Sequence, residues 1–162
     1  MTKDKLYTLL KEKLGDFVEL AANDTDLPTC IVNVQHIYQA IALLKDEHGF
    51  VFLTDVCGIH YPEQLLPLGV IYHLHNFKTN ERIRLKTFVS AESPIVPTLT
   101  SLFESANWME RETYDFYGIV FDGHPNLKRI LNVEYLDFYP MRKEYKLEDP
   151  TREDKDNRFF GR

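Results

Sequence analysis

Apolar residues in the first third of the chain change from helical to strand-like spacing. Leucines recur at helical intervals over Leu6–Leu14, and Gly15 follows as a stop signal, so the pattern predicts a helix that ends there. The runs FVELA (17–21) and TCIVNV (29–34) are short and apolar, and a polar stretch at 23–26 separates them. This arrangement predicts two short strands joined by a turn.

A second helix and three longer strands follow in the pattern. Ile37, Ile41 and Leu44 lie at helical spacing, and Gly49 marks the end of that segment. Three strand-like runs come next, and a polar tip at Lys78–Glu81 joins the last two as a hairpin: FVFLTDVCGI, LGVIYHLHNF and RIRLKTFVSA. Strict alternation over 82–87 predicts one polar face and one apolar face for the last strand.

The order of these elements defines the expected fold. Helices and hairpins occur in blocks instead of regular βαβ units, which favours an α+β domain. We expect two layers, with helices packed on one side of a mostly antiparallel or mixed sheet. After Pro94 and Pro97 the pattern becomes helical over 99–118. One domain is expected over residues 1–145, because no repeat or low-complexity linker interrupts them.

The last stretch, 146–162, differs from this domain. It contains five acidic and five basic residues, and one leucine precedes Phe159 and Phe160, so it has no core of its own. One interpretation is a solvated tail. We favour an extended arm whose two phenylalanines dock on a partner, since adjacent exposed aromatic side chains are unfavourable unless something covers them.

Charge and composition exclude several classes of protein. The chain has 162 residues, of which 44% are hydrophobic, and a formal net charge of -6, which disfavours a nucleic-acid-binding face. No apolar run reaches the roughly 20 residues that cross a bilayer, and the N-terminus lacks the pattern of a signal peptide. Cys30 and Cys57 lack CxxC spacing, so we expect two free thiols in a reducing compartment.

A histidine-rich group is the first candidate for chemistry. Cys57 and His60 precede a strand on which His73 and His75 alternate onto one face. Thiolate and imidazole are good zinc ligands, so a small metal-dependent enzyme is one alternative. A carboxylate or second thiol at diagnostic spacing is missing, and histidines on a half-buried strand are commonly amphipathic surface residues.

The second candidate is a helix expected from about Asn107 to Tyr117. Acids and aromatic residues alternate around its whole circumference, whereas a helix on its own core has one apolar stripe. Trp108, Glu112 and Asp115 share one face, Glu110 shares another with Tyr114 and Tyr117, and Arg111 lies one turn before Asp115. We predict that at least two of the four charged residues are buried in ion pairs: Glu110, Arg111, Glu112 and Asp115.

An enzyme could use the same stretch, with Glu110 or Glu112 as a general base and His124 as its partner. No nucleophile with an adjacent base is present, however, and neither GxGxxG nor GxxxxGK occurs. Aromatic residues mixed with arginine are typical of protein interfaces. The residues therefore favour an interaction subunit without a catalytic site.

Three motifs in the second half resemble one family. Trp108-Met-Glu-Arg-Glu-Thr-Tyr-Asp115-Phe-Tyr-Gly118, His124-Pro125-Asn-Leu127-Lys-Arg129-Ile-Leu and Pro140-Met-Arg142-Lys143-Glu144-Tyr145 are similar to the signature of the 30-kilodalton hydrophilic subunit of proton-translocating NADH:quinone oxidoreductase. The weaker N-terminal half also fits, including Tyr72–Leu74. The sequence departs from the family's pattern at Phe138-Tyr139, where Gly-His is usual, and at His60-Tyr61, where Asp-Tyr is common.

The resemblance implies an α+β subunit with no cofactor of its own. NADH, FMN, iron–sulfur clusters and quinone would belong to partner subunits of respiratory complex I. The main partners would be the quinone-site subunit and the small iron–sulfur subunit, at the cytoplasmic face of a bacterial inner membrane. A membrane-bound hydrogenase or chloroplast-type complex is the alternative setting. The motif residues, with Phe159 and Phe160 of the arm, would form the interface signature.

Overall fold

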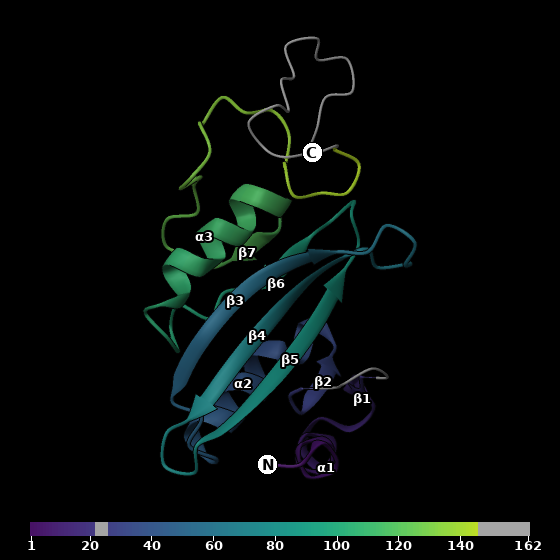
Figure 1. Cartoon of the computed structure of the whole chain (residues 1–162), viewed down its shortest axis with the longest axis vertical. Coiled ribbons are helices and arrows are strands. Elements are labelled where there is room, and N and C mark those ends of the chain that lie inside the picture. The colour runs from purple at the N-terminus through teal and green to yellow at the C-terminus, as the bar shows by residue number, and fades with distance from the viewer. Residues whose placement is uncertain (22–25, 146–162) are drawn as a thin grey trace, which may run out of the picture.

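A five-stranded mixed sheet forms the centre of the protein in a computed structural model that describes residues 1–21 and 26–145 (Figure 1). The strand order is β1-β2-β5-β4-β3, in which only β2 and β5 run parallel. The strands are β1 (Val18–Leu20), β2 (Thr29–Val32), β3 (Phe52–His60), β4 (Leu68–Asn76) and β5 (Glu81–Val89). The helices are α1 (Lys3–Leu14), α2 (Ile37–Asp46) and α3 (Ala106–Tyr117), with short 3-10 turns η1 (Gly15–Phe17) and η2 (Val34–His36).

The strand pattern read from the sequence determines which face of the sheet is covered. Strand β5 buries Ile83, Leu85, Thr87 and Val89, while Arg82, Arg84 and Lys86 alternate with them. The buried residues of β4 and β5 pair on the same face, where they join α1, α2 and α3 in one core. The α+β fold, with helices on one side of a mixed sheet, is thereby confirmed. Burying one Leu or Ile side chain of this core contributes about 1.5–3 kcal/mol.

The helix boundaries follow ordinary capping rules. Thr2 accepts a hydrogen bond from the backbone of Lys5 at the start of α1, and Gly15 ends the helix with φ 61°, as the sequence predicts. Helix α2 ends at Asp46, three residues before Gly49. Leu6 and Leu10 of α1 are fully buried. The N-terminal helix is therefore part of the core rather than an appendage.

A glycine in β3 lets α3 approach the sheet closely. A Cβ atom on Gly58 would lie 2.3 Å from the ring of Tyr117, so no larger residue fits without displacing the helix. The hydroxyl of Thr113 donates to the carbonyl of Val56, 3.5 Å away. These contacts fix the position of α3, the helix that carries the charged motif, on the edge strand of the sheet.

Two short strands escaped the sequence analysis. Strand β6 (Ile95–Pro97) precedes α3 in the sequence and β7 (Val120–Asp122) follows it. The two strands pair with each other in parallel. Three residues are too few to establish a period, and residues 99–105, expected to be helical, form turns instead. The predicted turn at 23–26 lies largely outside the described residues, and the arm at 146–162 lies entirely outside them. Within the described ranges, no helix has the length and apolar character needed to span a membrane.

Candidate interaction surface

Helix α3 is covered by a second part of the chain as well as by the sheet. Its buried residues include Glu110, Arg111, Thr113 and Asp115, whereas Trp108 is 61% exposed. The irregular segment 123–145, which follows β7, crosses the side of α3 that the sheet leaves open (Figure 1). The burial of charged residues on more than one side of α3 therefore has a simple cause, because the sheet covers one side and this segment covers another.

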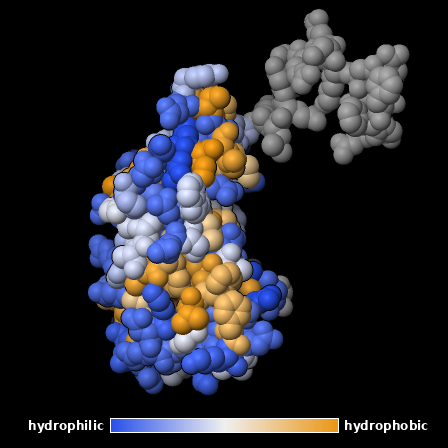
Figure 2. Space-filling view, turned by 90° about the vertical axis from the view of Figure 1, so that its left-hand side faces the viewer, coloured by the Kyte–Doolittle hydropathy of each residue, from blue (hydrophilic) through white to orange (hydrophobic). Residues whose placement is uncertain are grey.

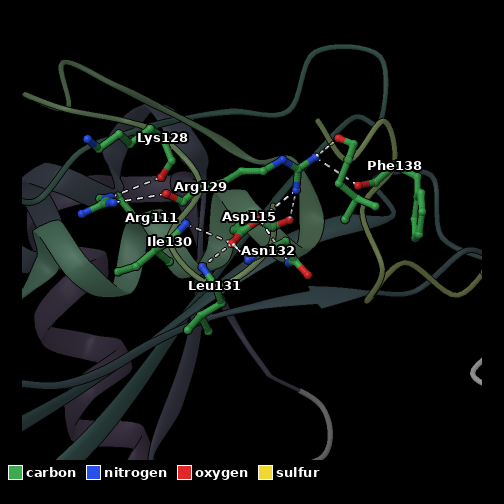
Figure 3. A network of polar contacts seen from close by, with 9 residues as sticks. Arg111, Asp115, Lys128, Arg129, Ile130, Leu131, Asn132 and Phe138 are labelled. Atoms are coloured by element: carbon green, nitrogen blue, oxygen red, sulfur yellow. Dashed lines mark hydrogen bonds and ion pairs between the residues drawn. The ribbon is translucent and has the colours of Figure 1, made fainter. Parts of the chain in front are cut away.

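The Asp115 carboxylate binds residues 129–132 of this segment (Figure 3). Its Oδ2 accepts backbone N–H hydrogen bonds from Ile130, Leu131 and Asn132 at 2.8–3.0 Å. Its Oδ1 accepts from Nη1 of Arg129 at 2.7 Å and from the side-chain amide of Asn132 at 3.1 Å. Burial alone would raise the pKa of Asp115, but these hydrogen bonds outweigh it and hold the pKa well below its usual range.

Arg129 links that carboxylate to the rest of the segment. Its Nη2 donates to the carbonyls of Leu136 and Phe138 at 2.7 and 3.1 Å, while Nη1 also reaches the backbone carbonyl of Asp115. The guanidinium lies over the Tyr139 ring, 5.2 Å from its centroid. We call these contacts, made by Asp115 and Arg129 with residues 130–132, 136 and 138, the Asp115 network. It holds a segment without helix or strand in one conformation.

Gly118 is required twice at the end of α3. It has φ 72°, in the left-handed region that favours glycine, and its N–H donates to the carbonyl of Tyr114. A Cβ atom there would also lie 2.4 Å from the Tyr139 ring. Arg142 stacks on the same ring at 4.8 Å and donates to the Tyr117 carbonyl at 2.7 Å. The close approach of Tyr139 to the helix end thus depends on the missing side chain.

Glu110, nearer the start of α3, has different surroundings. Its carboxylate accepts hydrogen bonds from the N–H of Leu99 at 2.7 Å and from the hydroxyl of Thr98 at 2.5 Å. Burial raises the pKa of Glu110 to about 7, and these two hydrogen bonds only partly oppose the rise. Burial raises the pKa of the Tyr72 hydroxyl well above its usual value, and the charge of Glu110 adds to the rise.

The prediction of buried ion pairs is partly wrong. Glu110, Arg111 and Asp115 are buried, but among contacts within residues 1–21 and 26–145 only Asp115 of the four forms an ion pair, with Arg129. Arg111 donates instead to the carbonyls of Lys128 and Arg129, each at 3.2 Å, and stacks on Trp108. Glu112 is exposed, so Trp108, Glu112 and Asp115 do not share one environment. Main-chain groups act as partners here, and a side-chain pattern does not reveal them.

The general-base arrangement does not form either. His124 accepts the N–H of Asn126 at Nδ1, and its Nε2 lies 3.1 Å from the carbonyl of Asn107. Both ring nitrogens are thus engaged by the backbone, and Glu110 is held by Thr98 and Leu99. Pro125 is exposed and Leu127 packs against the core. His124 and its neighbours therefore stabilise the turn that leads into the Asp115 network.

The histidine-rich group is divided between the two faces of the sheet. His73 and His75 share one face as expected, but His60 accepts the N–H of Lys143 at 2.9 Å and lies 3.4 Å from the Glu144 carboxylate. Across the described part of the chain no three such residues gather as a possible metal site. His73 accepts a hydrogen bond from Arg84 instead, at 2.8 Å. Burial, with a smaller effect of Asp55, raises the pKa of the Cys57 thiol to about 11.

The closing motif, residues 140–145, packs on the domain. Besides the Arg142 and Lys143 contacts, the Tyr145 ring lies 4.8 Å from Phe138, and Pro140 is half-buried. Phe159 and Phe160 lie outside the described residues. Cys30 is buried and Cys57 is half-buried.

Segment 123–145 exposes large apolar side chains that the sequence analysis did not single out. They are Leu131 (66% exposed), Val133 (48%), Tyr135 (87%) and Met141 (45%), and we call them the apolar ridge. Figure 2 shows apolar atoms at the surface near the upper end of the molecule, the end that this segment forms in Figure 1. The alternation of Leu131, Val133 and Tyr135 along the sequence could have indicated an apolar surface here. The network fixes the backbone beneath a surface suited to a protein partner.

Known proteins with similar sequences identify the family. Residues 30–151 match the family model described as the respiratory-chain NADH dehydrogenase, 30 Kd subunit. An NADH-quinone oxidoreductase subunit of Rhizobium meliloti is 37% identical over 89% of this chain and 72% of its own length. The corresponding NADH-quinone oxidoreductase subunit of Phenylobacterium zucineum is 44% identical over 67% of this chain, which spans about half (52%) of that relative.

Solved structures share the fold. The trypsin-resistant fragment (1-134) of Nqo5 superimposes with a TM-score of 0.67 and 30% identity, over 76% of this chain and 99% of the fragment. A chain of the membrane-bound sulfane sulfur reductase, an archaeal respiratory membrane complex, has a TM-score of 0.73 at 20% identity, over 89% of this chain and 85% of that one. Taken with the motif residues around Asp115, these matches establish that the chain belongs to the family of the 30 Kd subunit of respiratory-chain NADH dehydrogenase.

Proposed function

We propose that this chain is a non-catalytic docking subunit of an NADH-quinone oxidoreductase. The observation that carries the proposal is the apolar ridge on a segment held rigid by the Asp115 network. Exposed Leu, Val and Tyr side chains on a fixed backbone lose little conformational entropy when a partner covers them. In this proposal NADH, FMN, iron–sulfur clusters and quinone belong to partner subunits, and this chain contributes a binding surface.

The proposed main partner is the quinone-site subunit, with the small iron–sulfur subunit nearby. The chain would brace the quinone-site subunit within the hydrophilic arm, on the cytoplasmic face of the bacterial inner membrane. Relatives about 40% identical are named as subunits of NADH-quinone oxidoreductase, which favours an NADH-linked complex over a hydrogenase-type one. The ridge residues and Trp108 are of the apolar and aromatic types found at the centres of protein interfaces.

An assembly experiment tests this role. The tagged chain is expressed with the other subunits of the complex, and the co-purifying subunits are quantified together with NADH:quinone activity. We expect the Leu131→Ser, Tyr135→Ser double variant to reduce recovery of the partners at least about tenfold, since a tenfold change needs a combined loss of only about 1.4 kcal/mol from two covered interface residues.

A matched control uses Val51 and Phe77, which are also more than half exposed (56% and 60%) but lie far from the ridge in sequence. The Val51→Ser, Phe77→Ser variant should retain the partners, and both double variants should melt within a few degrees of the wild type. Normal recovery with the ridge variant, or equal loss with the control, would contradict a docking role for the ridge.

We also propose that residues 146–162 continue as an extended arm whose Phe159 and Phe160 contact a partner. The closing motif, which packs against His60 and Tyr117, would fix the point where the arm leaves the domain. The similar Nqo5 chain is named as a trypsin-resistant fragment, which fits a domain that is stable without such an arm. Deleting Thr151–Arg162 should leave the melting temperature unchanged while weakening retention in the complex. Unfolding of the truncated chain, or its assembly at wild-type levels, would refute the arm.

A further inference from the structure

A groove lies at one end of the sheet, and none of its lining residues belongs to the Asp115 network. It opens between β1, β2, the end of β5 and the loop that joins β3 to β4. Apolar side chains dominate its lining, and several reach the surface: Leu65 is 95% exposed, and Phe17, Leu66 and Ile95 are 43–49% exposed. Such a concentration of exposed large apolar side chains is uncommon on a surface that faces only water.

Two aromatic walls of the groove are held in place. The Phe88 ring lies against Gly69, where a Cβ atom would come within 2.8 Å of the ring, so the glycine leaves room for it across β4. The Phe17 ring stacks on His36 with centroids 4.0 Å apart. Because both rings are already held in place, binding a ligand does not cost the entropy of fixing them.

The charge of the groove is of one sign. Asp16 and Glu19 are lining residues, and no Lys, Arg or His belongs to the lining within the described residues. Asp16 is paired with Lys11 at 2.9 Å, whereas Glu19 is exposed and has no ion pair within the described ranges. A ligand that buries the apolar walls therefore gains more if it brings a positive charge to Glu19.

The polar lining suits a polypeptide. The side chains of Asn33, Gln64, Ser90 and Ser93 surround the apolar walls, and each can bond a peptide N–H or C=O. Sites for small molecules are more enclosed and bring a few polar groups together at one point. An open groove with spaced amides and hydroxyls, by contrast, matches the regular spacing of backbone groups in an extended segment.

We propose that this groove binds an extended segment of another subunit, one that carries a large apolar side chain next to a lysine or arginine. The inference rests on the proposed function only in that the chain works inside a multi-subunit complex. It adds a second interface, separate from the apolar ridge, and specifies the chemistry of the segment that fills it.

Site-specific photocrosslinking in the assembled complex tests the inference. Leu65 is replaced by the photoreactive residue p-benzoylphenylalanine, the complex is purified and irradiated, and the crosslinked peptide is identified by mass spectrometry. We expect a peptide from another subunit with Lys or Arg within about three residues of a large apolar residue, at the spacing of an extended segment. The same photoreactive residue at Val51, exposed but outside the groove, should not capture that peptide.

Charge reversal provides the second measurement. Glu19→Lys should lower the crosslink yield from Leu65 about fivefold, as expected for an exposed charge pair at an interface rim. Glu12→Lys changes an exposed acid on α1 outside the groove and should leave the yield unchanged.

Each alternative occupant gives a distinct result. A crosslink from Leu65 to residues 146–162 of the same chain, to a second copy, or to no protein in an otherwise complete complex overturns this inference alone. So does a yield that Glu19→Lys leaves unchanged. Failure of the wild-type chain to purify with any other subunit overturns the inference and the proposed function together.

Discussion

Two carboxylates on α3, one turn and a half apart, are equally buried and behave in opposite ways. Glu110 and Asp115 both have 0% exposure. Within the described residues, the Asp115 carboxylate receives five hydrogen bonds and the Glu110 carboxylate two. The pKa of Asp115 is held well below its usual range, whereas that of Glu110 is raised to about 7. Burial raises the pKa of both carboxylates, and only at Asp115 are the donors numerous enough to outweigh it.

The largest change in stability should come from removing the carboxylate of Asp115, which accepts more hydrogen bonds than that of Glu110. Asp115→Ala leaves the Arg129 charge and three backbone N–H groups without their acceptor in a buried place, so we expect a loss of about 3–5 kcal/mol in unfolding free energy. Chemical denaturation of the purified chain measures this loss. A loss below about 1 kcal/mol would show that water replaces the carboxylate easily, as at an exposed pair.

The pH dependence of stability separates the two carboxylates. Because the folded pKa of Glu110, about 7, exceeds its ordinary value of 4.5, its contribution is complete below about pH 4.5 and is lost as pH rises through 7. We expect the wild type to lose about 2–3 kcal/mol between pH 5 and 8, and Glu110→Gln to remove most of that slope. The contribution of Asp115 has the opposite sign and disappears only below about pH 4.

Denaturation curves at pH 5, 6, 7 and 8 measure this slope. Glu112→Gln is the matched control, since Glu112 is an exposed acid on the same helix. A slope that persists in Glu110→Gln would assign the titration to another group and break the comparison.

The packing around the Asp115 network gives a smaller effect. Gly118→Ala adds a Cβ atom at φ 72° and pushes it against Tyr139, on which Arg129 stacks, so we expect a loss of about 1–3 kcal/mol. Gly15→Ala is the control, because φ is 61° there but no atom lies within 4 Å of the added carbon. Equal losses for the two variants would mean that backbone strain alone matters and that Tyr139 moves freely.

The smallest effect is expected where α3 faces solvent. Glu112→Ala should change the unfolding free energy by less than about 0.5 kcal/mol, because Glu112 is exposed. Thermal and chemical denaturation check this value. A loss comparable to that of Asp115→Ala would contradict the view that the donors around a buried carboxylate cause the difference.

The sequence predicted what depends on periodicity. The alternation in β5 and the leucine spacing of α1 revealed the sheet, its covered face and the first helix. Strands β6 and β7 were not predicted, because three residues are too few to show an alternating pattern. The end of α3 was predicted correctly, since Gly118 is a strong stop signal, whereas the helical pattern was expected to begin too early, at residue 99.

The surroundings of the charged residues were harder to predict. Burial at Asp115 and Arg111 was foreseen from the mixture of charges and aromatics, but their partners were not. The donors to Asp115 are mostly backbone N–H groups of Ile130, Leu131 and Asn132, and the acceptors for Arg111 are carbonyls of Lys128 and Arg129. Every residue has these groups, so nothing in the side-chain sequence identifies which of them a buried charge meets.

The hydrogen-bonded residues of the Asp115 network are close to one another in the sequence, and this has a consequence for local motion. Its hydrogen bonds to residues 130–132 close loops of 15–17 residues, whereas the pairing of Thr29 with Arg84 closes a loop of about 55 residues. Closing the shorter loops costs about 1 kcal/mol less entropy. Reforming the network after a local opening therefore requires no rearrangement of the sheet, and we expect residues 129–138 to open and reclose as one cooperative unit. Hydrogen exchange should detect this opening at Ile130–Asn132 before any exchange of the buried amides of β4.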